Sequence, residues 1–314
     1  MKHFFRIAPF FCLIGFLSAQ DHSSTARAEV AQRDSKQTAW TPGMPEATAP
    51  TLGEDQEIYL LQQSEPFYVR SFTGLGYSSN VFSDSTGTGD NYLSQDLALG
   101  FETLIANRYY FYTEASSSIV RYDEFDVLDR ETAAASVGLN ADLSKTISIG
   151  IGYSHAWYFN GGFSENDSTF QTVAVSANWL QPLPQGSYLS LGPSVSRVWA
   201  SPSDFDQVVY SLGGGIIMPL DQKKILGITG FVSYSDFDNY FQSTFNEDRH
   251  DLTFGFGAWL SIRPSDMIEI RPEVTFTSND SSFSVIDPTD GSSEDFFDYE
   301  SWDVVPSLQV KVYF

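Results

Sequence analysis

Large apolar residues alternate with small or polar residues in long segments from Phe67 to the C-terminus, and turn residues separate these segments. Between Ile147 and Tyr153, every second residue is large and apolar, and each residue between them is Ser or Gly. Successive side chains of a β-strand point to opposite faces of the sheet, so this segment has one apolar face and one face of small polar groups. The same alternation is found at 170–180, 251–261 and 302–314. The chain is therefore predicted to be all-β from residue 67 onward.

The alternating segments are long. We place strands at 67–79, 92–105, 109–122, 132–143, 146–159, 168–180, 187–199, 207–219, 225–236, 249–262, 267–278 and 299–314. Their lengths suit a tilted strand that crosses a membrane, which needs about 10 residues, better than a strand of a soluble sheet, which has about 5–6. Tight turns, such as 144–145, alternate with longer acidic connections, such as 279–298. This arrangement is typical of membrane barrels, so we predict a transmembrane antiparallel up-and-down β-barrel of about twelve strands over 67–314.

A soluble β-sandwich is the alternative fold, because its strands alternate too. The polar face of a sandwich meets water and carries Lys, Glu and Thr, whereas here this face is mostly Ser, Gly, Ala and Asn, which suits a narrow lumen. Aromatic residues also gather near the ends of the segments, as in the two interfacial girdles of a membrane barrel. We assign to these girdles Tyr109, Tyr110, Tyr112, Tyr153, Trp157, Trp179, Tyr188, Trp199 and Trp302.

Three prolines, Pro193, Pro272 and Pro306, fall within predicted strands. Proline cannot donate a ladder hydrogen bond, and a closed barrel has no free edge at which that loss is harmless. We therefore expect a β-bulge at each of these positions.

The first 28 residues have the three parts of a secretory signal peptide. Two basic residues precede an apolar stretch from Ile7 to Ala19, and small residues allow cleavage after Ala19 or Ala28. Residues 29–66 are rich in Ala, Thr, Gln and Pro and have no sustained apolar period, so we predict a disordered or plug-like periplasmic arm. The mature protein is expected to be exported.

Charge and cysteine content exclude several classes of protein. The chain has 17 Lys and Arg against 40 Asp and Glu, which gives a formal net charge of −23. Such a surplus argues against binding nucleic acid, which needs clustered Lys and Arg. The single cysteine, Cys12, excludes a disulfide framework and a Cys-ligated zinc site.

Motifs of catalysis are missing from the sequence. It has no Gly-x-Ser-x-Gly, His-Glu-x-x-His or phosphate-loop motif, so we predict neither enzyme activity nor a cofactor. Alternation places His155 and His250 on the outward face. The run 248–251 resembles the Asp and His cluster of outer-membrane proteases, but we interpret it as a charged surface loop. The acidic loops 83–91 and 286–298 lack the spacing of an EF-hand and are interpreted as solvated surface without a metal.

Two short motifs carry a resemblance. The ending KVYF at 311–314 resembles the signal that the outer-membrane barrel assembly machinery recognises, with Phe314 as its terminal aromatic. The run GLGYSSNVF at 74–82 resembles the Gly-x-Gly-Tyr-x-x-Asn opening of porin-like β-barrels of Gram-negative bacteria. The resemblance implies integral insertion in the outer membrane and an assembly route, and it transfers no functional residue.

Alternation also predicts the charged lining of the lumen. The inward candidates are Asp96, Glu102, Glu114, Asp142, Glu269, Arg271, Glu273 and Lys311, with Arg70 doubtful because the first segment alternates poorly. We expect Arg271 to bridge the two glutamates beside it, and the other four carboxylates to lack a partner. Rings of carboxylates in a narrow pore favour cations.

These observations favour a passive outer-membrane channel for cations or small solutes. A non-conducting structural or surface-interaction barrel with acidic extracellular loops is the alternative, and a polysaccharide exporter or an outer-membrane hydrolase is a weaker one. The expected partners are outer-membrane lipids, the barrel assembly machinery and the solutes themselves, without nucleic acid. The transported solute and the oligomeric state stay open.

Overall fold

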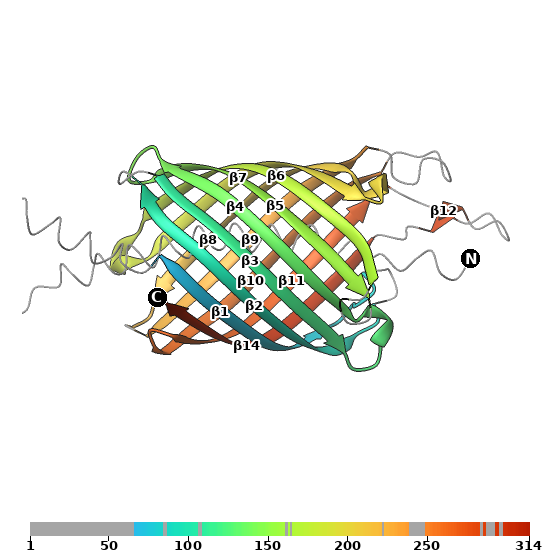
Figure 1. The fold of residues 1–314 in the computed structure, drawn as a ribbon, viewed down its shortest axis with the longest axis horizontal. Helices are drawn as coiled ribbons and strands as arrows, with labels where there is room; N and C mark the ends of the chain where they lie inside the picture. Colours follow the sequence, from blue (N-terminus) through green and yellow to red (C-terminus); the bar gives the residue numbers. More distant parts are fainter. Residues whose placement is uncertain are drawn as a thin grey trace, which may run out of the picture.

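Twelve long strands form one closed barrel in the part of the chain that the structure describes (Figure 1). The computed structural model describes residues 66–83, 87–105, 109–160, 163, 165–221, 223–238, 249–282, 285–286, 293–294 and 298–314. The barrel strands are β1 (Phe67–Ser78), β2 (Asp90–Ile105), β3 (Tyr109–Tyr122), β4 (Arg130–Asp142), β5 (Ile147–Asn160), β6 (Glu165–Pro182), β7 (Tyr188–Ser201), β8 (Gln207–Pro219), β9 (Lys224–Phe237), β10 (His250–Ser265), β11 (Ile268–Ser281) and β14 (Tyr299–Tyr313). The predicted all-β, up-and-down barrel is confirmed. The predicted signal peptide and all of the arm except Pro66 lie outside the described residues.

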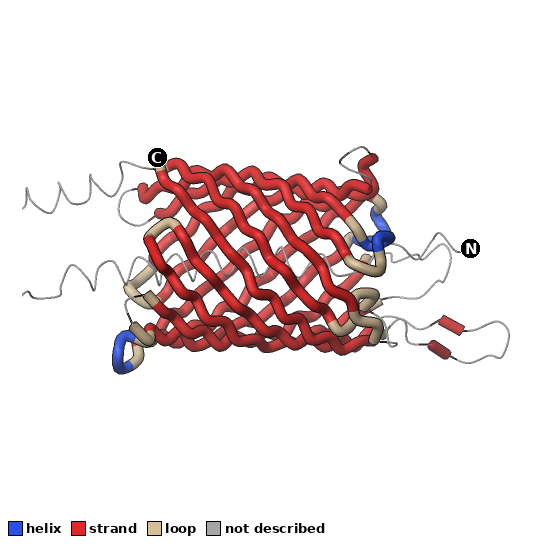
Figure 2. Tube along the Cα trace, turned by 90° about the horizontal axis from the view of Figure 1, so that it is seen from below, coloured by secondary structure: helices blue, strands red, loops and turns tan. Residues whose placement is uncertain are grey.

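Each strand pairs antiparallel with its neighbours in the chain, and β14 pairs with β1 to close the barrel. In this closing pair, Tyr68 faces Tyr313 and Ser78 faces Asp303. The backbone N–H of Phe314 donates to the carbonyl oxygen of Phe67 at 3.0 Å, so the last residue of the chain takes part in the closure. The strands run side by side at a common tilt (Figure 2). Closure leaves no unpaired sheet edge, which a strand in lipid requires.

The two ends of the barrel differ in their connections (Figure 1). At one end, called here the turn end, strands are joined by the short segments 106–108, 143–146, 183–187, 220–223 and 266–267. At the other end, called the loop end, most connections are longer; they are 79–89, 123–129, 161–164, 202–206, 238–249 and 282–298. The described connections contain three short 3-10 segments, η1 (Asp126–Leu128), η2 (Pro184–Gly186) and η3 (Ser203–Phe205), and the strand pair β12 (Val285–Ile286) and β13 (Ser293–Glu294). None of the described helices is long and apolar enough to cross a membrane.

The two faces of each strand differ as the alternation predicts. In β2, Leu97 and Leu99 are 52% and 58% exposed, whereas Ala98 between them is 1% exposed. Leu75 in β1 is 64% exposed on the same outer face. The large apolar side chains therefore point out of the barrel, and small or polar side chains point in. An apolar exterior around a polar interior is the arrangement of a membrane barrel.

The predicted aromatic girdles are only partly right. Trp157, Trp199 and Trp302 lie at outward positions toward the loop end, and Tyr109 and Trp179 lie at outward positions toward the turn end. Three others are wrong, because Tyr110, Tyr112 and Tyr188 occupy inward positions. Nearness to a strand end does not determine the face, and Tyr110 and Tyr112 have partners inside the barrel.

The prediction of bulges at the three prolines is wrong. The pairing register stays constant across Pro193, Pro272 and Pro306. Instead, each proline coincides with a short gap in the ladder on one side, between β6 and β7, β10 and β11, and β14 and β1, respectively. The many pairs on either side hold the register, so each ladder loses local pairing without an inserted residue. The register shifts in the described ladders lie elsewhere, at Tyr158/Phe159 and Ile262/Ser265.

Candidate functional site

The structure places all the charged residues predicted for the lumen at inward strand positions. On this inward face, Glu114 lies opposite Gly100 and Asp142 lies opposite Ser148. The set is Asp96, Glu102, Glu114, Asp142, Glu269, Arg271, Glu273 and Lys311, and Arg70 shares their face. They do not form one ring, because most of them belong to the wall made by β11, β14, β1, β2 and β3, which we call the charged wall.

Arg70 lies between two carboxylates near the turn end. Its Nη2 is 3.0 Å from Oε1 of Glu114 and 3.9 Å from Oδ1 of Asp96. The hydroxyl of Tyr68 donates to Oε2 of Glu114 at 2.6 Å. Because Arg70 and Glu114 lie on β1 and β3, this ion pair spans the strand between them. The expectation that Asp96 and Glu114 lack partners is therefore wrong.

Glu102 has three partners on the same wall. It accepts hydrogen bonds from the hydroxyls of Tyr110 at 2.6 Å and Tyr313 at 3.0 Å. Nζ of Lys311 lies 3.7 Å from Oε1 of Glu102, which corrects the expectation that this carboxylate is alone. The same Nζ lies 4.0 Å from the ring centroid of Tyr68 and 4.7 Å from that of Tyr313. The barrel closure thus brings the first and last strands together around one carboxylate.

Arg271 does not bridge the two glutamates beside it. Its Nε lies 3.3 Å from Oε2 of Glu273, whereas Oε2 of Glu269 lies 3.1 Å from Nε of Arg263. The guanidinium of Arg271 also stacks on Trp259, 4.3 Å from the ring centroid. The prediction missed Arg263 because β10 continues three residues beyond its predicted end. Asp142 lies at the inward, turn-end terminus of β4, and the expectation that it lacks a partner is wrong too.

Further charged residues of the inward face were not predicted. Alternation could have identified Asp303 and Asp251, which precede the outward residues Val304 and Leu252. Asp90 and Arg130 fell just outside the predicted strands, so their faces could not be assigned. Asp90 also ties a loop, because its Oδ2 accepts the backbone N–H groups of Glu124 and Phe125 at 2.9 and 3.1 Å.

Inward aromatic rings lie flat against the wall wherever a neighbouring strand offers glycine. A Cβ added at Gly100 would collide with the ring of Tyr68, and one added at Gly76 would collide with that of Tyr92. Other such pairs are Tyr112 on Gly138 and Trp259 on Gly227. An aromatic ring covering a cross-strand glycine is a known way to pin a sheet. It also keeps these large side chains from extending across the lumen.

The inward face of β5 to β8 forms a second, different wall. Many of its side chains are small, namely Ser148, Gly150, Gly152 and Ser154 in β5, Thr172, Ala174 and Ser176 in β6, Ser190, Gly192, Ser194 and Ser196 in β7, and Ser211, Gly213 and Gly215 in β8. We call this surface the small-residue wall. It faces the charged wall across the lumen, so the interior is polar on both sides but charged mainly on one.

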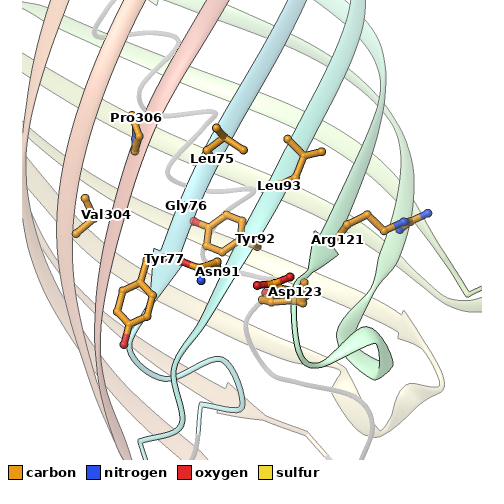
Figure 3. A pocket seen from close by; sticks show the side chains of 11 residues that line it. Leu75, Gly76, Tyr77, Asn91, Tyr92, Leu93, Arg121, Asp123, Val304 and Pro306 are labelled. Atoms are coloured by element: carbon orange, nitrogen blue, oxygen red, sulfur yellow. The ribbon is translucent and has the colours of Figure 1, made fainter.

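A pocket near the loop end is lined by residues of β14, β1, β2 and β3 (Figure 3). Leu75, Tyr77, Leu93 and Val304 line it from outward positions. Pro306 also lines it, at the gap in the β1–β14 ladder. Gly76, Tyr92 and Tyr122, which also line it, occupy inward positions, so its lining is not confined to the outer face.

The two described histidines occupy outward positions. His155 stacks on Trp157 with ring centroids 4.0 Å apart, and Nδ1 of His250 lies 3.0 Å from Oδ1 of Asp236. Within the run 248–251, Arg249 pairs with Asp251 on the inward side, so His250 and Asp251 point to opposite faces. The residues that resemble a protease cluster are thus divided between the two faces, and Asp248 lies outside the described residues.

Surface charges at the loop end tie strands together. Both terminal nitrogens of Arg197 in β7 donate to the carboxylate of Asp238, just after β9. These hydrogen bonds hold the pKa of Asp238 below its usual range. The described residues contain no group of three or more metal-ligating side chains, and parts of both acidic loops lie outside them.

Comparison with known proteins supports the fold. No protein-family model matches the chain, and no curated protein matches its sequence. Among solved structures, an outer-membrane channel from Pseudomonas putida is similar with a TM-score of 0.50 and 10% identity, over 87% of this chain and 100% of that one. The translocator domain of the autotransporter NalP from Neisseria meningitidis has a TM-score of 0.47 and 11% identity, over 82% and 94%. A KdgM porin in complex with oligogalacturonate has a TM-score of 0.41 and 11% identity, over 77% and 98%.

At these identities the likeness concerns the fold alone. The chain has the architecture of outer-membrane β-barrel porins and channels, as the resemblance of its two motifs implied. Its activity has to be argued from its own lumen.

Proposed function

We propose that this protein is a passive channel of the bacterial outer membrane that prefers cations. The observation that carries the proposal is the composition of the charged wall. At its turn end, Asp96, Glu102 and Glu114 share the two cations Arg70 and Lys311, which leaves an excess of carboxylate. Carboxylates that line a narrow pore favour cations.

The dimensions of the barrel support a narrow pore. Barrels of eight strands are filled by their own side chains, whereas those of about sixteen strands enclose a wide channel. Twelve strands lie between these limits. The small-residue wall and the flat aromatic rings, such as Tyr68 on Gly100, favour an interior with room for ions or small solutes.

The orientation follows the general pattern of such barrels, with short turns in the periplasm and long loops outside. We infer that a signal peptide over 1–28 directs export, that residues 29–66 form a periplasmic arm and that Phe314 belongs to the signal for the assembly machinery. The charged wall would then lie nearer the periplasm.

An enzymatic role has less support among the described residues, since His155 and His250 point outward. The remaining alternative function is that of a non-conducting barrel that acts through its acidic loops. Both readings share the fold, so only transport distinguishes them.

The test is single-channel recording of the purified mature protein in a planar lipid bilayer. A channel gives discrete current steps of reproducible size, whereas a plugged or structural barrel gives none. Heat-modifiable migration on a gel shows beforehand that the barrel is folded.

A further inference from the structure

An ammonium group is seated between two tyrosines and a carboxylate at the turn end of the lumen. Nζ of Lys311 lies 4.0 and 4.7 Å from the ring centroids of Tyr68 and Tyr313 and 3.7 Å from Oε1 of Glu102. The two ring centroids are 5.9 Å apart, and the rings are inclined by 58°. We call Tyr68, Tyr313 and Glu102 the ammonium cage.

The walls of the cage are held by contacts that do not involve Lys311. The hydroxyl of Tyr313 donates to Glu102 at 3.0 Å, and that of Tyr68 donates to Glu114 at 2.6 Å. The ring of Tyr68 also rests on Gly100. The cage is therefore preorganised, whereas Lys311 reaches it on a flexible four-carbon stem.

The chemistry of the cage selects one class of ligand. Tyrosine faces attract cations through their quadrupole, and such aromatic cages are used to recognise ammonium groups. The carboxylate of Glu102 adds a charge at the third side. A neutral alcohol lacks the positive charge that the rings and the carboxylate attract, and a hydrated metal ion gains less from the rings because it keeps its hydration shell.

We propose that the ammonium cage recognises cationic amines, and that Lys311 occupies it as a tethered competitor. The solute class is organic ammonium ions, such as alkylamines and polyamines. This proposal deepens the cation preference argued above and rests on it. The cage lies where β14 ends and β1 begins, so a solute that crosses the turn end passes beside it.

The test is calorimetric titration of the full mature protein in detergent micelles with n-butylammonium. In Lys311→Gln the tethered competitor is gone, so we expect n-butylammonium to bind about tenfold more tightly than to the wild type. Butanol is the probe for apolar contact alone, and potassium is the probe for charge alone. We expect neither to gain a comparable affinity in Lys311→Gln.

Arg70→Gln is the matched control, because it removes a positive charge from the same wall and leaves Lys311 in place. We expect it to raise the affinity for potassium and n-butylammonium alike. Tyr313→Leu added to Lys311→Gln should abolish the tenfold gain by removing one wall of the cage. Heat modifiability shows that each variant is folded.

Equal gains for n-butylammonium and potassium in Lys311→Gln would overturn the proposal, because Lys311 would then act only through its charge. An unchanged affinity for n-butylammonium in that variant would overturn it too. Binding in micelles does not require conduction. Binding without current would therefore contradict the channel and leave the cage standing, whereas current without selective binding would contradict the cage alone.

Discussion

The ring of Tyr68 lies flat over Gly100, its register partner across β1 and β2, where a side chain of any size would collide with it. This contact places the Tyr68 hydroxyl against Glu114 and its ring against Lys311. Glycine is required here by close approach and not by backbone conformation, since the φ angle of Gly100 is not positive. Gly100 thus determines where the ring of Tyr68 lies, and through that ring it positions Glu114 and Lys311.

We predict that Gly100→Ala displaces Tyr68 from the wall. The added methyl group occupies the space of the ring, so the ring has to turn toward the lumen and the hydrogen bond to Glu114 is lost. Overpacking of this kind costs about 1–3 kcal/mol of unfolding free energy. Single-channel conductance should fall, and the urea midpoint of folded protein should fall with it.

Gly152→Ala is the control for this change. Its added Cβ would lie 3.3 Å from the hydroxyl oxygen of Tyr112, a contact that a small shift of that side chain relieves. We expect near-wild-type conductance. If both alanine variants behave alike, the contact between Tyr68 and Gly100 does not control the pore.

Removal of the Arg70 guanidinium should strengthen the preference for cations. In Arg70→Gln, the carboxylates of Glu114 and Asp96 lose the group that lies between them, so the charged wall becomes more negative. Removing one partner of a part-buried ion pair also costs stability, about 1–3 kcal/mol. The reversal potential under a KCl gradient measures the first effect, and denaturant unfolding measures the second.

Removal of lumen carboxylates should weaken the preference for cations. Neutralising Asp96 and Glu114 together, as Asn and Gln, leaves the charge of Arg70 on the wall and should move the reversal potential toward zero or beyond. Lys145→Gln in the β4–β5 turn carries the same charge change as Arg70→Gln outside the lumen and should leave the potential unchanged. A shift in the turn variant equal to that in Arg70→Gln would refute local control of selectivity.

Deletion of Phe314 should reduce the amount of folded protein in the membrane. Its backbone N–H bonds to Phe67, and the two rings stack with centroids 6.4 Å apart, so the deletion removes contacts that close the barrel. Quantifying the heat-modifiable protein in outer-membrane fractions measures the effect. Phe314→Trp keeps the terminal aromatic and should assemble normally, whereas undiminished membrane levels after deletion would contradict the closure argument.

The pair of Arg197 and Asp238 should make a small, pH-dependent contribution to stability. Because the folded state lowers the pKa of Asp238, the contribution is present above the usual carboxyl pKa and is lost as the pH falls through the lowered value. The pair is partly exposed, so we expect less than about 1 kcal/mol. The wild type should be slightly more heat-stable than Asp238→Asn at pH 7, and this difference should vanish near pH 2. An equal difference at both pH values would mean that the ion pair is not its cause.

Periodicity predicted the barrel because one rule, apolar outside and small or polar inside, holds for nearly every strand. The same rule identified the inward face for Glu102 and Lys311. It could not identify their partners, since contacts such as that of Lys311 with Tyr68 join the two ends of the chain and depend on closure. It also misplaced Tyr110, because an aromatic near a strand end fits a girdle and a lumen equally well.

The prolines show a different limit. The sequence identifies the missing donor at Pro306, but not whether the chain responds with an inserted residue or an interrupted ladder. Register is determined by all the pairs of two long strands together, and a local signal cannot report on it.

We propose that the lumen passes cations in preference to anions, and the reversal potential under a KCl gradient measures this preference. With wild-type protein in a planar bilayer, we predict a reversal potential that has the sign of the potassium equilibrium potential. The preference for cations should weaken as the salt concentration rises, because the Debye length falls from about 10 Å at 0.1 M to about 3 Å at 1 M. A reversal potential with the sign of the chloride equilibrium potential would contradict cation preference.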